Sequence, residues 1–314
     1  MRAAVIDVGS NSILLLVAEF DGSGWRTVFE SSEVTGLGTG LGSGGELQPE
    51  SMSRTLDAIA EANKRAAGFG AAKVTAVGTM ALRIASNCDE FREKAAAQGT
   101  PVEVISGERE AELGLLCVLE DPVFASHECI SIVDPGGHST EIVIAQRDGD
   151  SWSTLSSTSY RIGALGLCDE VLGYDSPNGG QRLAATSQID SALSAQPPAS
   201  EPNVAVTLGA TGTNLVTMRE RMTTWDAALV HGAYLSYSDV GSAVGTLCDL
   251  TAAERAGLPG LEKGRELTIH AGALILERCL YLLRVEGCFV STRGWRHALL
   301  EQVAFDSRSP GRTS

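Results

Sequence analysis

The sequence predicts an α/β protein built from two lobes, and three observations support this. The composition, with 43% hydrophobic residues, 20% charged residues and 35 glycines, is typical of a globular α/β protein. A length of 314 residues is enough for two domains that each bury a core. One strand–turn–strand design occurs twice, from Ala3 to Val17 and from Ile130 to Ala145. Each predicted lobe therefore contains one copy.

Both copies join their two apolar strands through a turn that begins with an aspartate. The first turn is DVGSNS at residues 7–12, and the second is DPGGHSTE at residues 134–141. An aspartate at the end of a buried strand offers a carboxylate to a hydrated divalent cation, and the glycines after it expose backbone N–H groups to phosphate oxygens. One such turn is ordinary, because Asp and Gly favour turns in general. Two of them indicate a phosphate site.

A third glycine loop strengthens the prediction. The segment GATGT at residues 209–213 follows the apolar run from Val204 to Leu208 and precedes a stretch with helical character. A glycine loop that opens a helix is a common phosphate-binding arrangement, because the free N–H groups of the first turn point at the anion.

The formal net charge of −15 bears on possible partners. Nucleic acid and anionic membranes require a basic face, so we predict neither as a partner. No apolar run reaches the length of a membrane span, and the N-terminus lacks a signal-peptide layout, so we predict a cytoplasmic protein. A polyanionic substrate would need divalent cations to offset the repulsion.

The cysteines and histidines do not form a recognisable metal or disulfide pattern. The seven cysteines contain no C-x-x-C pair, and the five histidines lack zinc-type spacing. We therefore expect buried, reduced thiols. His138 differs from the other histidines only because it lies inside the second turn.

The remaining elements follow the periodicity of the chain. The predicted helices are Glu50–Phe69, Asn87–Gln98, Glu108–Leu119, Ser187–Ala195, Asp239–Leu247, His270–Arg284 and Trp295–Val303, and the predicted strands are Lys73–Gly78, Val102–Ile105 and Cys288–Ser291. Asn87 is expected to cap its helix. The segment from Gly173 to Asn203 is rich in Gly, Pro, Ser and Ala, so it is predicted to be surface loop around one short helix.

Three acidic residues crowd the first turns of the helix from Glu108 to Leu119. Glu108, Glu110 and Glu112 are suited to catalysis, but acidic residues at a helix N-terminus also complement the helix dipole. The residues alone do not decide between these interpretations.

Seven ordered motifs resemble the exopolyphosphatase/guanosine pentaphosphatase (Ppx/GppA) family, over almost the whole chain to about Leu300. They are Asp7-x-Gly-Ser-Asn-Ser, Thr79-x-Ala-Leu-Arg83-x-Ala-x-Asn87, Ser106-Gly107-x-x-Glu110-Ala111, Asp134-x-Gly-Gly-x-Ser-Thr-Glu141, Leu258-Pro-Gly-Leu-Glu-x-Gly-Arg265, Ala271-Gly-Ala-Leu-Ile-Leu276 and Arg293-Gly-x-Arg296.

The resemblance implies a two-lobed architecture of the actin, sugar-kinase and chaperone ATPase superfamily, with ribonuclease H-like lobes and an interdomain cleft. The N-terminal lobe is expected at residues 1–120, joined by a C-terminal helix at 298–306. The second lobe is expected at residues 121–297, followed by a disordered tail at 307–314.

The resemblance also implies site residues. Glu110 is expected to be the general base that activates water, and the metal ligands for Mg²⁺ or Mn²⁺ are expected to be Asp7, Asp134 and Glu141. The expected phosphate-binding residues are Gly9, Ser10, Asn11, Arg83, Gly136, Gly137, His138, Ser139, Gly209, Gly212, Thr213 and Arg293. In-line hydrolysis of a phosphoanhydride requires such a base, cations and N–H donors.

Several positions depart from the family pattern. Pro135 and His138 stand where an aliphatic residue and a third glycine are usual, and Gly36 and Gly166 each stand where an arginine is usual. The other departures are Thr211, Leu267 and Thr292. For His138, one interpretation is a phosphate ligand whose imidazolium replaces missing positive charge, and the other is a side chain that points to solvent.

Three functions are compatible with the sequence. The first is a metal-dependent phosphohydrolase acting on inorganic polyphosphate or on a guanosine alarmone of the stringent response. The second is a catalytically weakened sensor that binds one of these ligands, and the third is a kinase. A homodimer is compatible with the chain.

Overall fold

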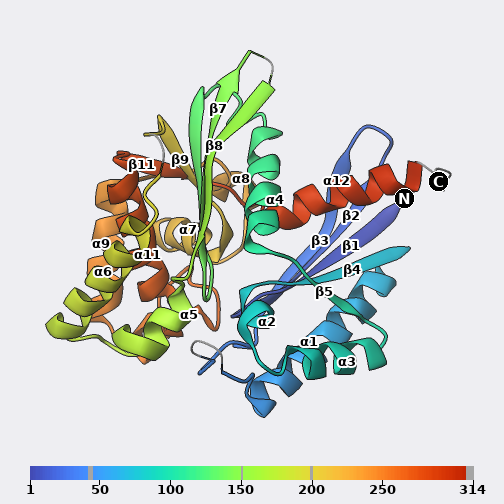
Figure 1. The fold of residues 1–314 in the computed structure, drawn as a ribbon, viewed down its shortest axis with the longest axis horizontal. Coiled ribbons are helices and arrows are strands. Elements are labelled where there is room, and N and C mark those ends of the chain that lie inside the picture. Colours follow the sequence, from blue (N-terminus) through green and yellow to red (C-terminus); the bar gives the residue numbers. More distant parts are fainter. Residues whose placement is uncertain (42–44, 150, 199–200, 309–314) are drawn as a thin grey trace. The chain divides into compact units, whose positions relative to one another are not determined.

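The computed structural model describes residues 1–41, 45–149, 151–198 and 201–308, with side chains as far as residue 302. Figure 1 shows the path of the chain. The chain divides into two compact units. The first unit combines Met1–Ser106 with the residues from Trp295 onward, and the second is Gly107–Gly294. Each unit holds one sheet with helices packed on it.

The sheet of the first unit contains the predicted strands and one further strand, β3 (Trp25–Val34), that was not predicted. Among the described residues it has the order β3-β2-β1-β4-β5, with β1 to β3 antiparallel and β4 and β5 parallel to β1. The strands are β1 (Arg2–Val8), β2 (Ser12–Phe20), β3 (Trp25–Val34), β4 (Lys73–Gly78) and β5 (Val102–Val104). Because parallel strands end at the same edge, Asp7 near the end of β1 shares an edge with the end of β4.

The helices of the first unit are α1 (Pro49–Gly68), α2 (Met80–Ile84), α3 (Cys88–Ala97) and α12 (Trp295–Arg308). Both α1 and α12 contact β1 and β2, and Figure 1 shows them on opposite sides of this sheet. The predicted helix at Glu50–Phe69 is confirmed as α1, and its residues Met52, Leu56 and Ile59 are buried at helical spacing. The prediction that Asn87 caps α3 is wrong. Its side chain instead accepts a hydrogen bond from the Leu47 N–H and donates one to the Leu47 carbonyl.

The second unit repeats the topology of the first. Within its described part, the sheet order is β10-β11-β9-β6-β7-β8; β6 to β8 are antiparallel, and β9 and then β11 continue the sheet parallel to β6. The strands are β6 (Cys129–Pro135), β7 (Thr140–Asp148), β8 (Ser151–Tyr160), β9 (Val204–Thr207), β10 (Tyr234–Ser236) and β11 (Gly287–Val290). The short strand β10 is an addition at one edge.

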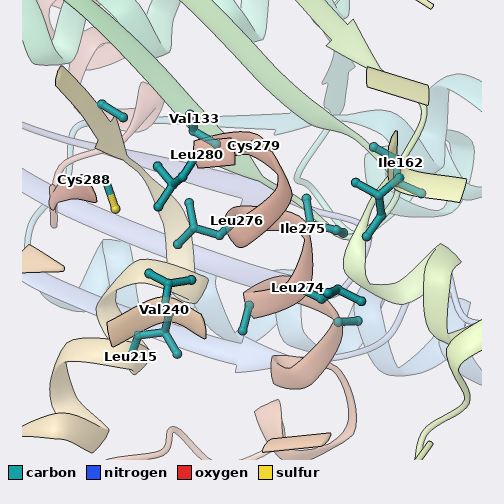
Figure 2. Close-up of a cluster of buried hydrophobic side chains, with 14 of the residues drawn as sticks. Val133, Ile162, Leu215, Val240, Leu274, Ile275, Leu276, Cys279, Leu280 and Cys288 are labelled. Carbon is teal, nitrogen blue, oxygen red and sulfur yellow. The ribbon is translucent and has the colours of Figure 1, made fainter. Parts of the chain in front are cut away.

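The helical elements of the second unit are α4 (Gly107–Leu119), α5 (Ala164–Leu167), a π-helix η1 (Cys168–Leu172), α6 (Gly179–Ser194), α7 (Gly209–Arg219), α8 (Ala227–Val230), α9 (Tyr237–Asp249), α10 (Ala252–Ala256), a 3-10 helix η2 (Arg265–Leu267) and α11 (Ile269–Leu283). The core of the unit forms around α11. In Figure 2, labelled side chains of α11 such as Leu276 and Leu280 lie among those of β6, α7, α9 and β11.

The prediction of mainly surface loop from Gly173 to Asn203 is wrong over α6. That helix begins eight residues earlier than the predicted one. It has a capping box, in which the backbone N–H of Asn178 donates to the Gln181 side chain and the backbone N–H of Gln181 donates to the Asn178 side chain, each at 3.0 Å. Ala185, Ile189 and Leu193 recur at helical spacing and are buried. A satisfied N-terminus and this apolar stripe outweigh the low helix propensity of the glycines at its start.

Two boundaries differ from the sequence prediction. The units divide at residue 106 rather than 120, because α4 packs on β6, β7 and β8 of the second unit. The prediction of a C-terminal helix that joins the first unit agrees with this division, although α12 extends to Arg308. The predicted disordered tail therefore begins inside a helix, and its residues 309–314 lie outside the described part of the chain.

One buried cation ties together several segments of the second unit. Arg255 is fully buried, and its guanidinium donates to the backbone carbonyls of Tyr174, Leu247, Leu250 and Glu266 at 2.6 to 3.1 Å. These carbonyls would lose their partner if the guanidinium were removed, and a buried unpaired acceptor is costly.

We therefore expect Arg255→Met to lower the free energy of unfolding by about 3 kcal/mol, since the hydrogen bonds of a charged donor are lost while the carbonyls stay buried. Denaturant titration measures the change. The matched control is Arg284→Met, at an arginine whose side chain is 75% exposed, which should shift stability by less than about 0.5 kcal/mol. Equal effects of the two substitutions would contradict this role for Arg255.

Candidate functional site

The two aspartate turns have the same geometry, as their sequences predict. In the first unit the Gly9 N–H donates to the Ser12 carbonyl at 3.0 Å, and in the second the Gly136 N–H donates to the Ser139 carbonyl at 2.8 Å. A Cβ at Gly9 would lie 3.0 Å from its carbonyl partner, and one at Gly136 would lie 2.9 Å away. A Cβ at either position would crowd this carbonyl, so glycine suits the close approach in both turns.

The first turn is anchored by its own unit. The Ser10 hydroxyl accepts a bond from the Ala81 N–H at 3.1 Å, and the Asn11 carbonyl accepts from Thr35 and Gly36 at 2.9 Å. The hydroxyl of Ser10 therefore positions the turn against α2. Whether the turn also binds phosphate, as predicted for residues 9–11, stays a prediction.

Arg83 of α2, the predicted phosphate ligand of the first unit, lies at the carboxyl edge of the sheet. Its guanidinium donates to the Ile105 carbonyl at 3.0 Å and approaches the Met80 sulfur at 3.5 Å. Part of the donor capacity of Arg83 is thus used to join the end of β5 to α2.

Arg296 of α12 was not among the predicted site residues, but it contacts one of them. Its Nη1 lies 3.4 Å from Oδ2 of Asp7, the predicted metal ligand on β1, and both side chains are largely buried. The signal was present in the motif Arg293-Gly-x-Arg296, of which only Arg293 was selected.

Arg293 lies in the second unit and is engaged elsewhere. Its Nη1 is 3.5 Å from Oδ2 of Asp121, and the same oxygen is 3.2 Å from Nε2 of His231. The Thr292 N–H donates to Nδ1 of that histidine at 3.3 Å. Arg293 therefore belongs to a polar cluster at the end of β11, and its predicted phosphate role is untested.

The second turn is docked on the helix α5. The carbonyl of Gly136 accepts from Ala164, and the carbonyl of Gly137 accepts from Leu165 and Gly166, at 2.8 to 3.0 Å. A Cβ at Gly163 would lie 2.4 Å from the carbonyl carbon of Gly137. The glycine at 163 is therefore what allows the turn at 136–139 to rest on this helix.

His138 is buried, with 8% of its surface exposed, and packs against Gly166. A Cβ at Gly166 would lie 3.3 Å from the ring Cδ2. Among the described residues neither ring nitrogen has a hydrogen-bond partner. Burial lowers the pKa of His138, and the charges of Asp169 and Glu170 oppose the shift. The interpretation that His138 points to solvent is wrong, and a buried ring of low pKa is a poor replacement for a permanent cation.

Three carboxylates interact within the second unit. Glu141 is buried, and Ser159 donates to its Oε1 at 2.7 Å. Burial raises the pKa of Glu141 well above its usual range, and the charges of Glu110 and Asp134 raise it further. The predicted base and two predicted metal ligands are thus close enough for their negative charges to repel one another.

The third glycine loop approaches the same carboxylates. Because β9 runs parallel to β6, the residue after β9 comes beside the end of β6. Gly209 has φ +74°, and a Cβ there would lie 2.8 Å from Oδ1 of Asp134. The other two predicted residues serve the helix itself: Gly212 makes room for Thr207, and the Thr213 hydroxyl donates back to the Ala210 carbonyl at 3.2 Å.

The fit of a metal ion can be judged from these groups. Asp7 belongs to the first unit, and Asp134 and Glu141 belong to the second. No three metal-binding side chains form a preformed cluster in the part of the chain that the structure describes. The crowding of Asp134 and Glu141 nevertheless fits a hard cation, because oxygen ligands of like charge are costly to hold together without one.

Solved structures define the class of protein. The Ppx/GppA protein of Aquifex aeolicus aligns with 98% of this chain and 99% of its own, at 27% identity and a TM-score of 0.77. An exopolyphosphatase from Cytophaga hutchinsonii has the same fold, with a TM-score of 0.86 at 23% identity over 98% of both chains. The predicted α/β architecture of actin-like ATPase type is confirmed.

The chain belongs to the Ppx/GppA phosphatase family, whose model matches residues 16–304. "Exopolyphosphatase 2" of Mycobacterium tuberculosis is 29% identical over 96% of this chain and 97% of its own length. A guanosine-5'-triphosphate,3'-diphosphate pyrophosphatase of Photobacterium profundum is 32% identical over 64% of this chain and 38% of its own. Each helix in the described part of the chain is too short or too polar to cross a membrane.

The buried imidazole of His138 predicts a pH effect on stability. Its pKa lies below the usual 6.5, so the unfolded chain binds more protons as the pH falls below about 6.5, and stability declines. His138→Asn should make that decline shallower, as measured by denaturant unfolding between pH 7 and pH 5. The control His127→Asn, at a half-buried histidine, should keep the wild-type slope. Identical slopes for His138→Asn and the wild type would refute the prediction.

Proposed function

We propose that this protein is a metal-dependent phosphohydrolase that releases terminal phosphate from inorganic polyphosphate or guanosine pentaphosphate. The observation that carries the proposal is the convergence of Glu110, Asp134 and Glu141 in one unit, expressed as the raised pKa of Glu141. Such crowding is costly for stability and is typical of a catalytic site. Family membership and the names of the relatives support the same reaction class.

The roles follow from position. Glu110 lies near the start of α4 and would accept the proton of a water molecule as the oxygen attacks the terminal phosphorus. The bond from phosphorus to the bridging oxygen then breaks, which gives orthophosphate and a ligand shorter by one phosphate. The N–H groups of residues 137–139 would bind the phosphate oxygens, whereas the Gly136 N–H closes the turn on the Ser139 carbonyl.

Asp134 and Glu141 are the groups of the second unit that would hold Mg²⁺ or Mn²⁺, which when bound would neutralise the phosphate oxygens. Because Gly209 has no Cβ, the loop after β9 can lie against the Asp134 carboxylate. The first unit also has a carboxylate, that of Asp7, followed by a glycine turn at residues 9–11.

The alternative of a catalytically weakened sensor gains no support from the relatives, which are named as enzymes. The buried position of His138 bears on it indirectly. A neutral imidazole packed on Gly166 does not bring a positive charge to the phosphate turn, so affinity for phosphate must come from N–H groups, other cations and the metal. A cytoplasmic location and a role in the stringent response stay predictions.

The test is a phosphate-release assay with Mg²⁺ on tripolyphosphate, long-chain polyphosphate, guanosine pentaphosphate and ATP. Release from polyphosphate or from guanosine pentaphosphate, with little from ATP, supports the proposal and identifies the substrate. Tight binding without release would favour the sensor.

Replacing the base gives the sharpest test of mechanism. We expect Glu110→Gln to keep substrate binding and to lower kcat by about two to four orders of magnitude, the usual contribution of a general base. The matched control is Glu108→Gln, an exposed glutamate in the first turn of the same helix, which should retain near wild-type turnover. Similar turnover in both variants would remove Glu110 from the mechanism.

The metal requirement is testable separately. Because Asp7, Asp134 and Glu141 offer only oxygen ligands, we expect activity with Mg²⁺ or Mn²⁺ and none after exhaustive chelation. Re-addition of Mg²⁺ should restore phosphate release. Turnover that survives chelation would contradict the assignment of these carboxylates.

A further inference from the structure

The carboxylate at the end of β1 has a cation beside it that comes from the opposite end of the chain. Asp7 and Arg296 are 289 residues apart in sequence, yet Arg296 Nη1 and Asp7 Oδ2 are 3.4 Å apart. The side chains are 9% and 14% exposed, respectively. Both residues belong to the first unit, where α12 contacts β1. A buried carboxylate is costly without such a counter-charge.

The pair is close but not tightly bonded. Charge-assisted hydrogen bonds from a guanidinium to a carboxylate usually measure about 2.7 to 2.9 Å and are often bidentate. Arg296 makes a single contact of 3.4 Å with Asp7, and its buried Nε has no hydrogen-bond partner among the described residues. The guanidinium therefore retains unused donor capacity next to the turn at 9–11.

A second acidic group lies near the same cation. Partial burial raises the pKa of Glu30 on β3, and the charge of Arg296 opposes that shift. Nε2 of His297 is 3.5 Å from Oε1 of Glu30. Arg296 is thus attracted electrostatically by both Asp7 and Glu30, and no tight hydrogen bond fixes it to Asp7.

We propose that Arg296 sets the order of ligand binding at Asp7: its positive charge disfavours a divalent cation alone and favours the cation together with phosphate. An anion beside Arg296 offsets the guanidinium charge and draws it from Asp7, which leaves this carboxylate available to the metal. The inference rests on the proposed function only for the ligand class, a phosphoryl group with a hard divalent cation. Arg296 is then a positioning residue that couples the two ligands.

Linkage makes the proposal quantitative. If phosphate raises the affinity for the cation, the cation must raise the affinity for phosphate by the same factor. Removing the charge of Arg296 should weaken this coupling from both directions. It should also improve binding of the cation alone, because two positive charges no longer repel in a site of low dielectric.

The experiment is calorimetric binding of Mn²⁺ to the full chain, with and without inorganic phosphate, for wild type, Arg296→Gln and Arg296→Lys. We expect Arg296→Gln to bind Mn²⁺ alone about tenfold more tightly and to lose most of the gain that phosphate gives the wild type. Arg296→Lys keeps the charge and should retain part of the coupling. The control Arg26→Gln, at an exposed arginine of the same unit, should match the wild type.

Two outcomes would overturn the proposal. One is a wild type whose Mn²⁺ affinity is unchanged by phosphate, which needs no variant and so stands even if Arg296→Gln fails to fold. The other is a folded Arg296→Gln with wild-type Mn²⁺ affinity and coupling. Neither readout depends on turnover, so a protein that releases no phosphate but shows the coupling would reject the proposed hydrolysis and keep this role for Arg296.

Discussion

Negative charge gathered at the carboxyl ends of the central strands is the constraint to which the rest of the structure responds. Glu141 is buried with Glu110 and Asp134 near it, and the result is a carboxyl group whose pKa is raised well above its usual range. Asp7 is the aspartate of the first unit that corresponds to Asp134, and the guanidinium of Arg296 lies beside it as a counter-charge. In the second unit the crowded charges favour a protonated Glu141 or a bound cation. In the first unit the cation is the guanidinium of Arg296 beside Asp7.

Glycine lets the backbone pack closely around these charged strand ends. The turns at Gly9 and Gly136 close on a carbonyl that a Cβ would crowd, and Gly209, in a left-handed conformation, brings a helix N-terminus against Asp134. Gly163 then supports the second turn from behind, since a side chain there would overlap its backbone. The glycines therefore have two roles: Gly9 and Gly136 allow the turns to form, and Gly163 allows the second turn to pack on α5.

His138 and Gly166 illustrate how two unusual residues can compensate for each other. A histidine in the predicted phosphate-binding turn and a glycine on the helix beside it each look unfavourable for anion binding in isolation. In the fold the imidazole ring of His138 packs against Gly166, where a larger side chain would crowd it, so the two residues are suited to each other. The cost is a buried imidazole whose nitrogens lack partners in the described chain, which makes this contact sensitive to acid.

The sequence by itself determined the repeated strand–turn–strand design, the two-lobed α/β class and most helices, because these depend on local spacing of Asp, Gly and apolar residues. The turn pattern pointed to Asp134, whereas Glu110 and Glu141 were selected only through the resemblance of the ordered motifs to the Ppx/GppA family. Only the tertiary structure decided which partners these groups have. The contact of Arg296 with Asp7, the burial of His138 and the assignment of α4 to the second unit all depend on packing between segments distant in sequence. Periodicity describes which face of an element is buried, but it does not specify which residue of another element will lie against it.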